Sequence, residues 1–195
     1  MEALGTPSAD FWKGKRVLLT GHTGFKGTWL HYWLDELGAQ TAGLSFSGYP
    51  KTVLGSAVNP TSLEIDADIG TRGWQSRVAD YAPEIIFHLA AQALVYTGFQ
   101  DPKTTFETNV VGSIHLLEIL ENTPSVRVIV IITTDKVYRI EKGSAPRVET
   151  DPIGGSDPYS ASKGAVELIV RGWPLSTTQS IATARSGNVI GGGDD

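Results

Sequence analysis

The sequence contains no cysteine among its 195 residues. Disulfide bonds, thiol nucleophiles and cysteine-ligated metal sites are therefore excluded, which suits a reducing compartment and leads us to expect a cytoplasmic protein. No apolar run approaches the roughly eighteen residues of a membrane-spanning helix. The first ten residues contain acidic side chains and no apolar segment of the signal-peptide kind, so we also expect no secretory signal.

Clusters of basic residues are equally absent. The 16 lysines and arginines are scattered and are outnumbered by 21 acidic residues, which gives a net charge of −5. This balance argues against a protein that binds nucleic acid or anionic membranes. The four histidines show no spacing that is typical of metal ligands, so we expect no metal site.

The residues that are present describe an ordinary globular protein, with 41% hydrophobic and 19% charged residues. A chain of this length is sufficient for one α/β domain with a hydrophobic core. We expect residues 1–13 to form a loose leader and residues 14–195 to form a single domain.

Short apolar runs alternate with segments of helical periodicity along this domain. The sequence predicts strands at residues 16–20, 41–46, 62–65, 85–89, 126–132 and 180–185, and helices at 24–37, 72–81, 102–123 and from 158 onward. This alternation predicts an α/β fold with a doubly wound parallel sheet of the Rossmann type. In such a sheet, ligands bind beyond the carboxyl ends of the strands. The apolar side of the 102–123 helix either packs on the sheet or pairs with a second copy of the chain.

The first predicted strand is followed by the turn Gly21-His22-Thr23-Gly24-Phe25-Lys26-Gly27. A glycine-rich turn between a strand and a helix N-terminus presents backbone N–H groups and the positive end of the helix dipole to a phosphate. The spacing is G-x-x-G-x-x-G rather than the commoner G-x-G-x-x-G, and in this strand–turn–helix context it predicts dinucleotide binding. Lys26 either contacts the cofactor or is solvated.

Tyr159 and Lys163 are four residues apart on a predicted helix, so their side chains share one face. A lysine cation close to a phenol favours the phenolate and lowers the tyrosine pKa, which suits a proton acceptor from a sugar or alcohol hydroxyl. A surface tyrosine beside a solvated lysine is the alternative, because motifs this short recur by chance. The nucleotide-binding turn and Thr134, at the end of the most hydrophobic strand, favour the catalytic interpretation.

Other polar and aromatic residues are predicted to be structural. His88 lies in an apolar strand and is expected to be a core histidine with satisfied hydrogen bonds. The tryptophans Trp12, Trp29, Trp33 and Trp74 are expected to pack in the protein rather than to form a stacking platform for a ligand.

Several motifs together resemble the extended short-chain dehydrogenase/reductase family. They are Thr20-Gly21-x-x-Gly24-x-x-Gly27, His88-Leu89-Ala90-Ala91-Gln92, Asn109-Val110-x-Gly112 and Tyr159-x-x-x-Lys163. Within this family, the longer segments 21–30, 134–138, 151–160 and 187–194 are similar to the CDP-glucose 4,6-dehydratases. Lys136 stands where the related dTDP-glucose dehydratases usually have glutamate, which indicates the cytidine branch.

The resemblance implies an internal redox cycle with NAD as the cofactor and CDP-glucose, a nucleotide-sugar, as the substrate. Tyr159 would accept the proton of the sugar 4-hydroxyl, Lys163 would bind the nicotinamide ribose and tune Tyr159, and Thr134 would hydrogen-bond the reacting oxygen. Asp135 would protonate the departing 6-hydroxyl, for which it must be protonated when substrate is bound. Lys136 would take part at C5 as a base only if it is neutral. The product would be the 4-keto-6-deoxy sugar.

The resemblance also implies a set of cofactor-binding residues: Gly21, His22, Thr23, Gly24, Phe25, Lys26, Gly27, Asp68, Ile69, Leu89, Ala90, Ala91, Gln92, Asn109, Tyr159 and Lys163. It implies substrate contacts from Gln92, Thr134 and Asn188, and a homodimer or other homo-oligomer. Asp68 would contact the adenine, with an N-cap of the following helix as the alternative.

Two features depart from the family pattern. The second strand ends in Ser45-Phe46-Ser47, without the acidic residue that usually binds the ribose 2′-hydroxyl of NAD, so NADP stays open. The chain is also about half the length of relatives whose C-terminal part binds the nucleotide-sugar. Three hypotheses therefore stand: a 4,6-dehydratase truncated in chain, a nucleotide-sugar 4-epimerase, and a non-catalytic NAD-binding domain. Asp135 and Lys136 argue against the epimerase, which needs no acid for loss of water.

Overall fold

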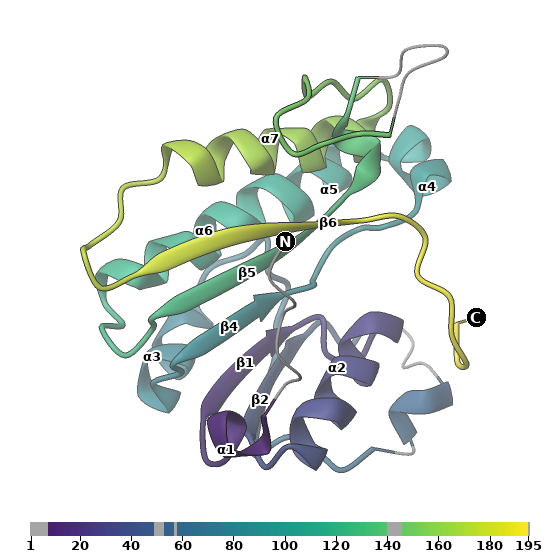
Figure 1. Cartoon of the computed structure of the whole chain (residues 1–195). Helices are drawn as coiled ribbons and strands as arrows, with labels where there is room; N and C mark the ends of the chain where they lie inside the picture. Colours follow the sequence, from purple (N-terminus) through teal and green to yellow (C-terminus); the bar gives the residue numbers. More distant parts are fainter. Residues whose placement is uncertain (1–7, 49–52, 57, 140–145, 195) are drawn as a thin grey trace.

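A computed structural model describes residues 8–48, 53–56, 58–139 and 146–194 (Figure 1). Six strands form one parallel sheet in the order β3-β2-β1-β4-β5-β6. The strands are β1 (Arg16–Thr20), β2 (Gln40–Ser45), β3 (Leu63–Asp66), β4 (Ile85–His88), β5 (Val128–Thr134) and β6 (Ser180–Ser186). This is the doubly wound order of the Rossmann fold, so the predicted fold class is confirmed.

Helices connect the strands and cover the sheet. They are α1 (Ala9–Trp12), α2 (Phe25–Glu36), η1 (Val53–Ser56), α3 (Gln75–Tyr81), α4 (Val95–Gln100), α5 (Pro102–Phe106), η2 (Glu107–Val111), α6 (Gly112–Glu118), η3 (Ile119–Glu121), η4 (Asp135–Val137) and α7 (Pro158–Gly172). Within the described ranges, no helix is both long and apolar enough to cross a bilayer.

Side chains that point alternately to the two faces of the sheet divide the core into two layers. Val17 and Leu19 of β1 pack with Leu34 of α2, whereas Leu18 faces the opposite layer, which holds Leu116 of α6. Successive side chains of a strand point to opposite faces, so two apolar layers follow from one continuous apolar run.

The face of β5 and β6 on the α2 side is less covered than the face under α7. Val130 and Ile132 of β5 are only partly buried there, and Ala182 and Ala184, their partners in the register with β6, are exposed. Parallel sheets are ordinarily covered on both faces. Among the described residues, this end of the sheet is therefore covered less on the α2 side than on the α7 side.

The parallel register brings the carboxyl ends of the strands to a common edge. Thr20 at the end of β1 is aligned with His88 at the end of β4, and Thr134 at the end of β5 is aligned with Ser186. After β6 the chain crosses back toward α2 (Figure 1), where the indole N–H of Trp29 donates to the Gly192 carbonyl at 3.0 Å. The residues predicted to carry the chemistry follow these strand ends.

Several local predictions need correction. The 102–123 helix is interrupted by the π-helical turn η2, and α4 is absent from the sequence prediction. The loose leader contains the short helix α1, whose Trp12 ring lies 6.2 Å from that of Phe87. Trp29 and Trp33, expected to pack in the protein, are 43% and 53% exposed, and the Trp29 ring lies edge-on to the Tyr32 ring at 6.4 Å. Trp74 is buried as predicted.

Candidate cofactor site and active site

The turn between β1 and α2 is built on close contacts between backbones. Gly21 has φ +71°, and a Cβ there would lie 2.7 Å from the amide nitrogen of Ala90. A Cβ at Gly27 would collide with the Gly21 carbonyl and lie 2.7 Å from the Cα of His22. Both positions therefore require glycine.

Gly24 differs from these two glycines because it is exposed and its neighbourhood is open. A Cβ there would meet only the Gly21 carbonyl oxygen, at 3.4 Å. Gly24 is the N-cap of α2, and no side chain caps the first turn of that helix. The helix N-terminus thus offers backbone N–H groups to an approaching anion, which fits the pyrophosphate of a dinucleotide.

Two lysine ammonium groups belong to the same site. Lys26 is half-buried, and burial lowers its pKa, so it is not the fully solvated side chain that was one of the two alternatives. Lys163 is 5% exposed; burial first, and then the charge of Lys26, lower its pKa to about 8. A buried ammonium whose protonation is depressed by burial and by a second cation is suited to a bound anion, which would offset both effects.

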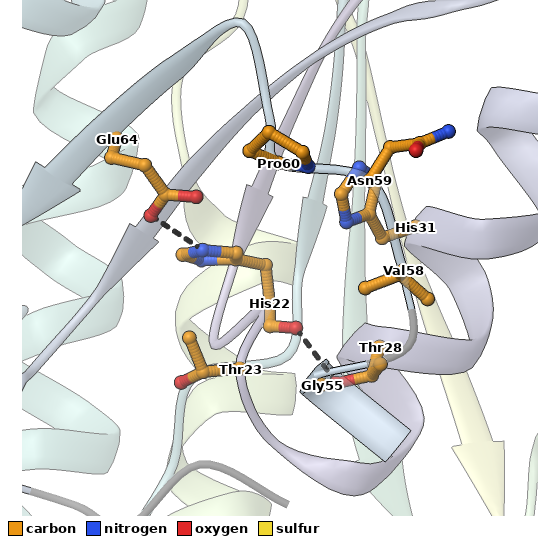
Figure 2. Close-up of a pocket in the computed structure, with 9 residues that line it drawn as sticks. All are labelled: His22, Thr23, Thr28, His31, Gly55, Val58, Asn59, Pro60 and Glu64. Atoms are coloured by element: carbon orange, nitrogen blue, oxygen red, sulfur yellow. Dashed lines mark hydrogen bonds and ion pairs between the residues drawn. The ribbon is translucent and has the colours of Figure 1, made fainter.

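His22 lies within the turn, but its ring is directed at β2 and β3. Figure 2 shows the ring beside Glu64, with Nε2 2.8 Å from a carboxylate oxygen; Nδ1 is 2.8 Å from the Ser45 hydroxyl. The ring is buried over Gly43, whose Cβ would lie 2.5 Å from Nδ1. It borders a pocket of about 150 Å³ that also includes His31. The predicted contact of His22 with the cofactor stays a prediction.

Asn109 and Gln92 were predicted to contact ligands. In the structure they are hydrogen-bonded to each other and buried. The Asn109 amide accepts from the Gln92 backbone N–H at 2.8 Å and donates to the Gln92 carbonyl and to the Ser162 hydroxyl of α7. The Gln92 side chain is bonded to Leu94 and Thr105. Both residues are buried, so their side chains shape the loop after β4 and join it to α7.

His88 is a core residue, as predicted. Its ring lies 2.6 Å from the Thr20 hydroxyl and 3.0 Å from the Ser113 hydroxyl. Burial, with a smaller contribution from the Lys163 charge, lowers its pKa to about 3, so the ring is neutral at pH 7. A neutral ring between two hydroxyls joins the ends of β1 and β4 to α6.

Asp68 and Ile69 follow β3. A carboxylate oxygen of Asp68 accepts from the Gly70 N–H at 2.8 Å, and the next helix begins only at Gln75. The alternative role of Asp68 as the N-cap of that helix is therefore wrong. Ile69 is buried against Gly112. The contact of Asp68 with adenine stays a prediction.

Helix α7 places Tyr159 in its first turn. Asp157 caps the helix by accepting from the Ser160 N–H at 3.0 Å, and Pro158 occupies the first helical position. One turn later, the Lys163 ammonium donates to the Ile132 carbonyl of β5 at 3.0 Å. The helix is thus held against the end of the strand that carries Thr134.

The pKa of Tyr159 differs from the sequence expectation. Burial raises it, a hydrogen bond with Thr134 opposes the rise, and the charges of Asp135 and Asp157 add to it, so that the net shift is upward. The predicted lowering by Lys163 is wrong for this structure, because that ammonium reaches the backbone of β5 and Thr134 is the partner of the phenol.

The remaining predicted residues lie at the end of β5. The Thr134 hydroxyl donates to Asp135 at 3.2 Å and accepts from the Lys136 N–H at 3.3 Å. Asp135 and Lys136 are exposed in the short helix η4. A Cβ on Gly187 would lie 3.4 Å from the Asp135 carboxylate, so the turn after β6 meets η4 next to the exposed Asn188.

A family model described as the NAD dependent epimerase/dehydratase family matches residues 17–195. The chain belongs to this family. It is 40% identical to the CDP-glucose 4,6-dehydratase of Salmonella typhimurium over 95% of this chain and 55% of that protein. It is 31% identical to the dTDP-glucose 4,6-dehydratase of Neisseria gonorrhoeae over 82% of this chain and 50% of that protein. The chain thus spans about half the length of these relatives.

Among solved structures, the UDP-glucose 4-epimerase of Thermotoga maritima superposes with a TM-score of 0.80 at 26% identity, over 92% of this chain and 58% of that one. The epimerase of Methanothermobacter thermautotrophicus, at 24% identity and a TM-score of 0.82, shares the fold. NAD is the cofactor of the NAD-dependent epimerase/dehydratase family, and the open position at Gly24, at the N-terminus of α2, fits the cofactor's pyrophosphate. The residues that contact NAD stay predictions.

The sequence did not point to two residues of α7 that connect this helix to the rest of the candidate site. Ser162 joins α7 to Asn109, and Glu167 accepts hydrogen bonds from β5 and β6. The available signal for Glu167 was its spacing, since Tyr159, Lys163 and Glu167 recur every four residues along one helix face.

The buried ammonium of Lys163 generates a prediction about stability. Its pKa is about 8 in the folded protein and 10.5 as the ordinary value, so below pH 8 the folded state carries a charge that is better solvated in the unfolded chain. We expect Lys163→Met to raise the free energy of unfolding at pH 7 by up to roughly 3 kcal/mol. This advantage shrinks as the pH rises from 8 to 10.5, because there the folded protein has released the Lys163 proton while the unfolded chain still holds it, which stabilises the unsubstituted protein.

Urea denaturation of both proteins across this pH range measures the difference. The exposed Lys136→Met is the matched control and is expected to parallel the unsubstituted protein at every pH. Parallel curves for Lys163→Met would show that the ammonium is not destabilised by burial.

Proposed function

We propose that the chain is the cofactor-binding half of a sugar-nucleotide 4,6-dehydratase that acts on CDP-glucose. The observation that carries this proposal is the grouping of Tyr159, Thr134 and Asp135 at the carboxyl edge of the sheet. The 40% identity with a CDP-glucose 4,6-dehydratase supports the substrate. A cytoplasmic location is consistent with this chemistry and is proposed with it.

Tyr159 accepts the proton of the sugar 4-hydroxyl. Thr134 holds the reacting oxygen, because its hydroxyl is the polar partner of the phenol. The Lys163 ammonium binds the ribose of the cofactor and places a positive charge near its phosphates. It also anchors α7 by its hydrogen bond to the Ile132 carbonyl. The turn at Gly24, with Lys26 and Lys163, would hold NAD, which would supply the hydride acceptor and donor of the internal redox cycle. Burial raises the phenol pKa, so positive charge brought by the bound cofactor would have to favour the phenolate during proton transfer.

Asp135 and Lys136 account for loss of water. A ketone at C4 acidifies the C5 proton, so the C5–H and C6–OH bonds can break and leave a C5–C6 double bond. Asp135 gives the departing hydroxyl its proton, and Lys136 in its neutral form accepts the proton from C5. Both side chains are exposed in this half, so bound substrate must supply the desolvation that keeps the Asp135 acid protonated. Gln92 and Asn188 border the sugar in this proposal.

Two other functions are consistent with the fold. A 4-epimerase needs Tyr159 and Thr134 but has no use for an acid at position 135, which is why we favour the dehydratase. A non-catalytic NAD-binding domain is the second.

Calorimetric titration separates these functions. We expect the purified chain to bind NAD, and to bind CDP-glucose with formation of the 4-keto-6-deoxy product. NAD binding without CDP-glucose binding would assign this chain to cofactor binding alone. Failure to bind either molecule would overturn the enzyme proposal for this chain. UDP-glucose is the control ligand, and its conversion to the 4-epimer would instead support the epimerase.

The two chemical steps can be separated by a pair of variants. We expect Tyr159→Phe to retain NAD binding and to lose at least about 100-fold in the rate of oxidation at C4. Asp135→Asn should oxidise C4 but release little product, so NADH absorbance accumulates in a single turnover. Normal dehydration by Asp135→Asn would remove that residue from the acid role.

We also propose that two copies of the chain associate through α5, η2 and α7. Leu117 and Leu120 pack in the core, as one alternative for the 102–123 helix expected. Phe106, Val111 and Leu168 point outward from neighbouring elements and are 39%, 37% and 59% exposed. Exposed apolar side chains that lie together are typical of an interface.

Sedimentation equilibrium tests this association. We expect a dimer that Leu168→Glu converts to a monomer, while Leu175→Glu, at another exposed leucine outside these elements, leaves it intact. A monomer at all protein concentrations would contradict the proposal.

A further inference from the structure

Glu167 on α7 is a buried carboxylate with a complete set of partners. Its side chain is 2% exposed. One oxygen accepts from the Thr133 hydroxyl at 2.5 Å and from Nε of Arg185 at 3.0 Å. The other accepts from Nη2 of Arg185 at 2.8 Å and from the Thr183 hydroxyl at 3.0 Å.

These partners keep the carboxylate ionised. Burial by itself raises the pKa of Glu167, but the hydrogen bonds from Arg185, Thr133 and Thr183 outweigh burial and hold the pKa below its ordinary value. A buried carboxylate with a two-point arginine contact and two hydroxyl donors is a strong and directional junction. It joins α7 to both β5 and β6.

The junction extends to the segment that follows the catalytic strand. Tyr138 directly follows η4, and the Arg185 guanidinium lies 4.9 Å from the centre of its ring. Arg185 also donates to the Glu149 carbonyl at 3.1 Å. Thr133 immediately precedes Thr134. Glu167 is therefore bonded, directly or through Arg185, on both sides of the Thr134–Val137 segment.

We propose that Glu167 is a positioning residue that sets the distance of α7 from the end of β5 and so brings the Tyr159 phenol to the Thr134 hydroxyl. This inference rests on the proposed function of Tyr159 and Thr134. Glu167 lies two helical turns beyond Tyr159, roughly 12 Å along the axis, so it does not touch the reacting groups. The link to the active site passes through Thr133, whereas Thr183 links Glu167 to the neighbouring strand.

The two threonines provide a matched experiment. Thr133→Val and Thr183→Val are the same substitution, each removes one uncharged donor from the same carboxylate, and neither changes the charge of the protein. The readout is the pKa of Tyr159, measured by NMR titration of the chain labelled with ring-¹³C tyrosine, with Tyr159→Phe to assign the resonance. This measurement needs no turnover, so it is informative even if CDP-glucose is not a substrate.

We expect Thr133→Val to raise the Tyr159 pKa by about half a unit or more, because a looser contact with Thr134 removes the hydrogen bond that lowers it. Thr183→Val should leave that pKa unchanged. A purely stabilising role for Glu167 would give no shift with either variant, or equal shifts with both, and either result overturns the proposal.

The variant Glu167→Gln tests the direction of the shift in the Tyr159 pKa. Loss of a negative charge by itself lowers the pKa of a nearby phenol, whereas loss of the Thr134 contact raises it. We expect a rise, and in an active enzyme a lower kcat with little change in KM for the nucleotide-sugar. A fall or no change in the Tyr159 pKa would contradict positioning. If Glu167→Gln does not fold because Arg185 is left unpaired, the threonine pair decides the question alone.

Discussion

The backbone of the β1–α2 turn lies directly against the backbone of the loop that follows β4, and the rest of the site depends on that contact. A Cβ on Gly21 would sit 2.7 Å from the amide nitrogen of Ala90, and Gly27 tolerates no side chain against the Gly21 carbonyl. Because the two strand ends are this close, Thr20 and His88 hydrogen-bond across them. Between these two close contacts, Gly24 is exposed, and a phosphate can approach the N-terminus of α2 there.

Buried polar groups then join the loop after β4 and the sheet to α7. Asn109 connects the loop after β4 to Ser162, Lys163 reaches the Ile132 carbonyl, and Glu167 receives donors from β5 and β6. Each of these groups would be costly to bury without its partner. Hydrogen bonds to these partners offset the free-energy cost of burial and, because they are directional, hold α7 at a defined position on the sheet. Lys163 is the exception, since its lowered pKa shows that burial is incompletely offset.

The chain carries the cofactor-binding features of the NAD-dependent epimerase/dehydratase family within about half the length of its relatives. Asp135 and Lys136 are exposed, and so are Ala182 and Ala184 on one face of β6. Catalytic acids and bases generally act in desolvated surroundings. In the proposed reaction, the desolvation of Asp135 and Lys136 would have to come from the bound substrate.

Much of this arrangement could be predicted from local sequence. Strand β1 begins and ends as predicted, and the glycine turn, the cap and proline at the start of α7 and the burial of His88 follow from patterns within a few residues. Periodicity and backbone sterics are local properties, so they are legible in the chain. The π-helical turn at η2 was not predicted, because a one-residue insertion in helical hydrogen bonding has no clear local signature.

By itself, the sequence determined the order of the strands along the chain, the parallel sheet and the placing of Tyr159 and Lys163 on one helix face. Only the tertiary structure decided which groups these side chains meet. Lys163 bonds to Ile132, His22 turns to Glu64, and Glu167 collects donors from two strands. Contacts between residues far apart in the chain, and the burial that shifts the Tyr159 pKa upward, depend on how the layers pack, and no short stretch of sequence encodes that packing.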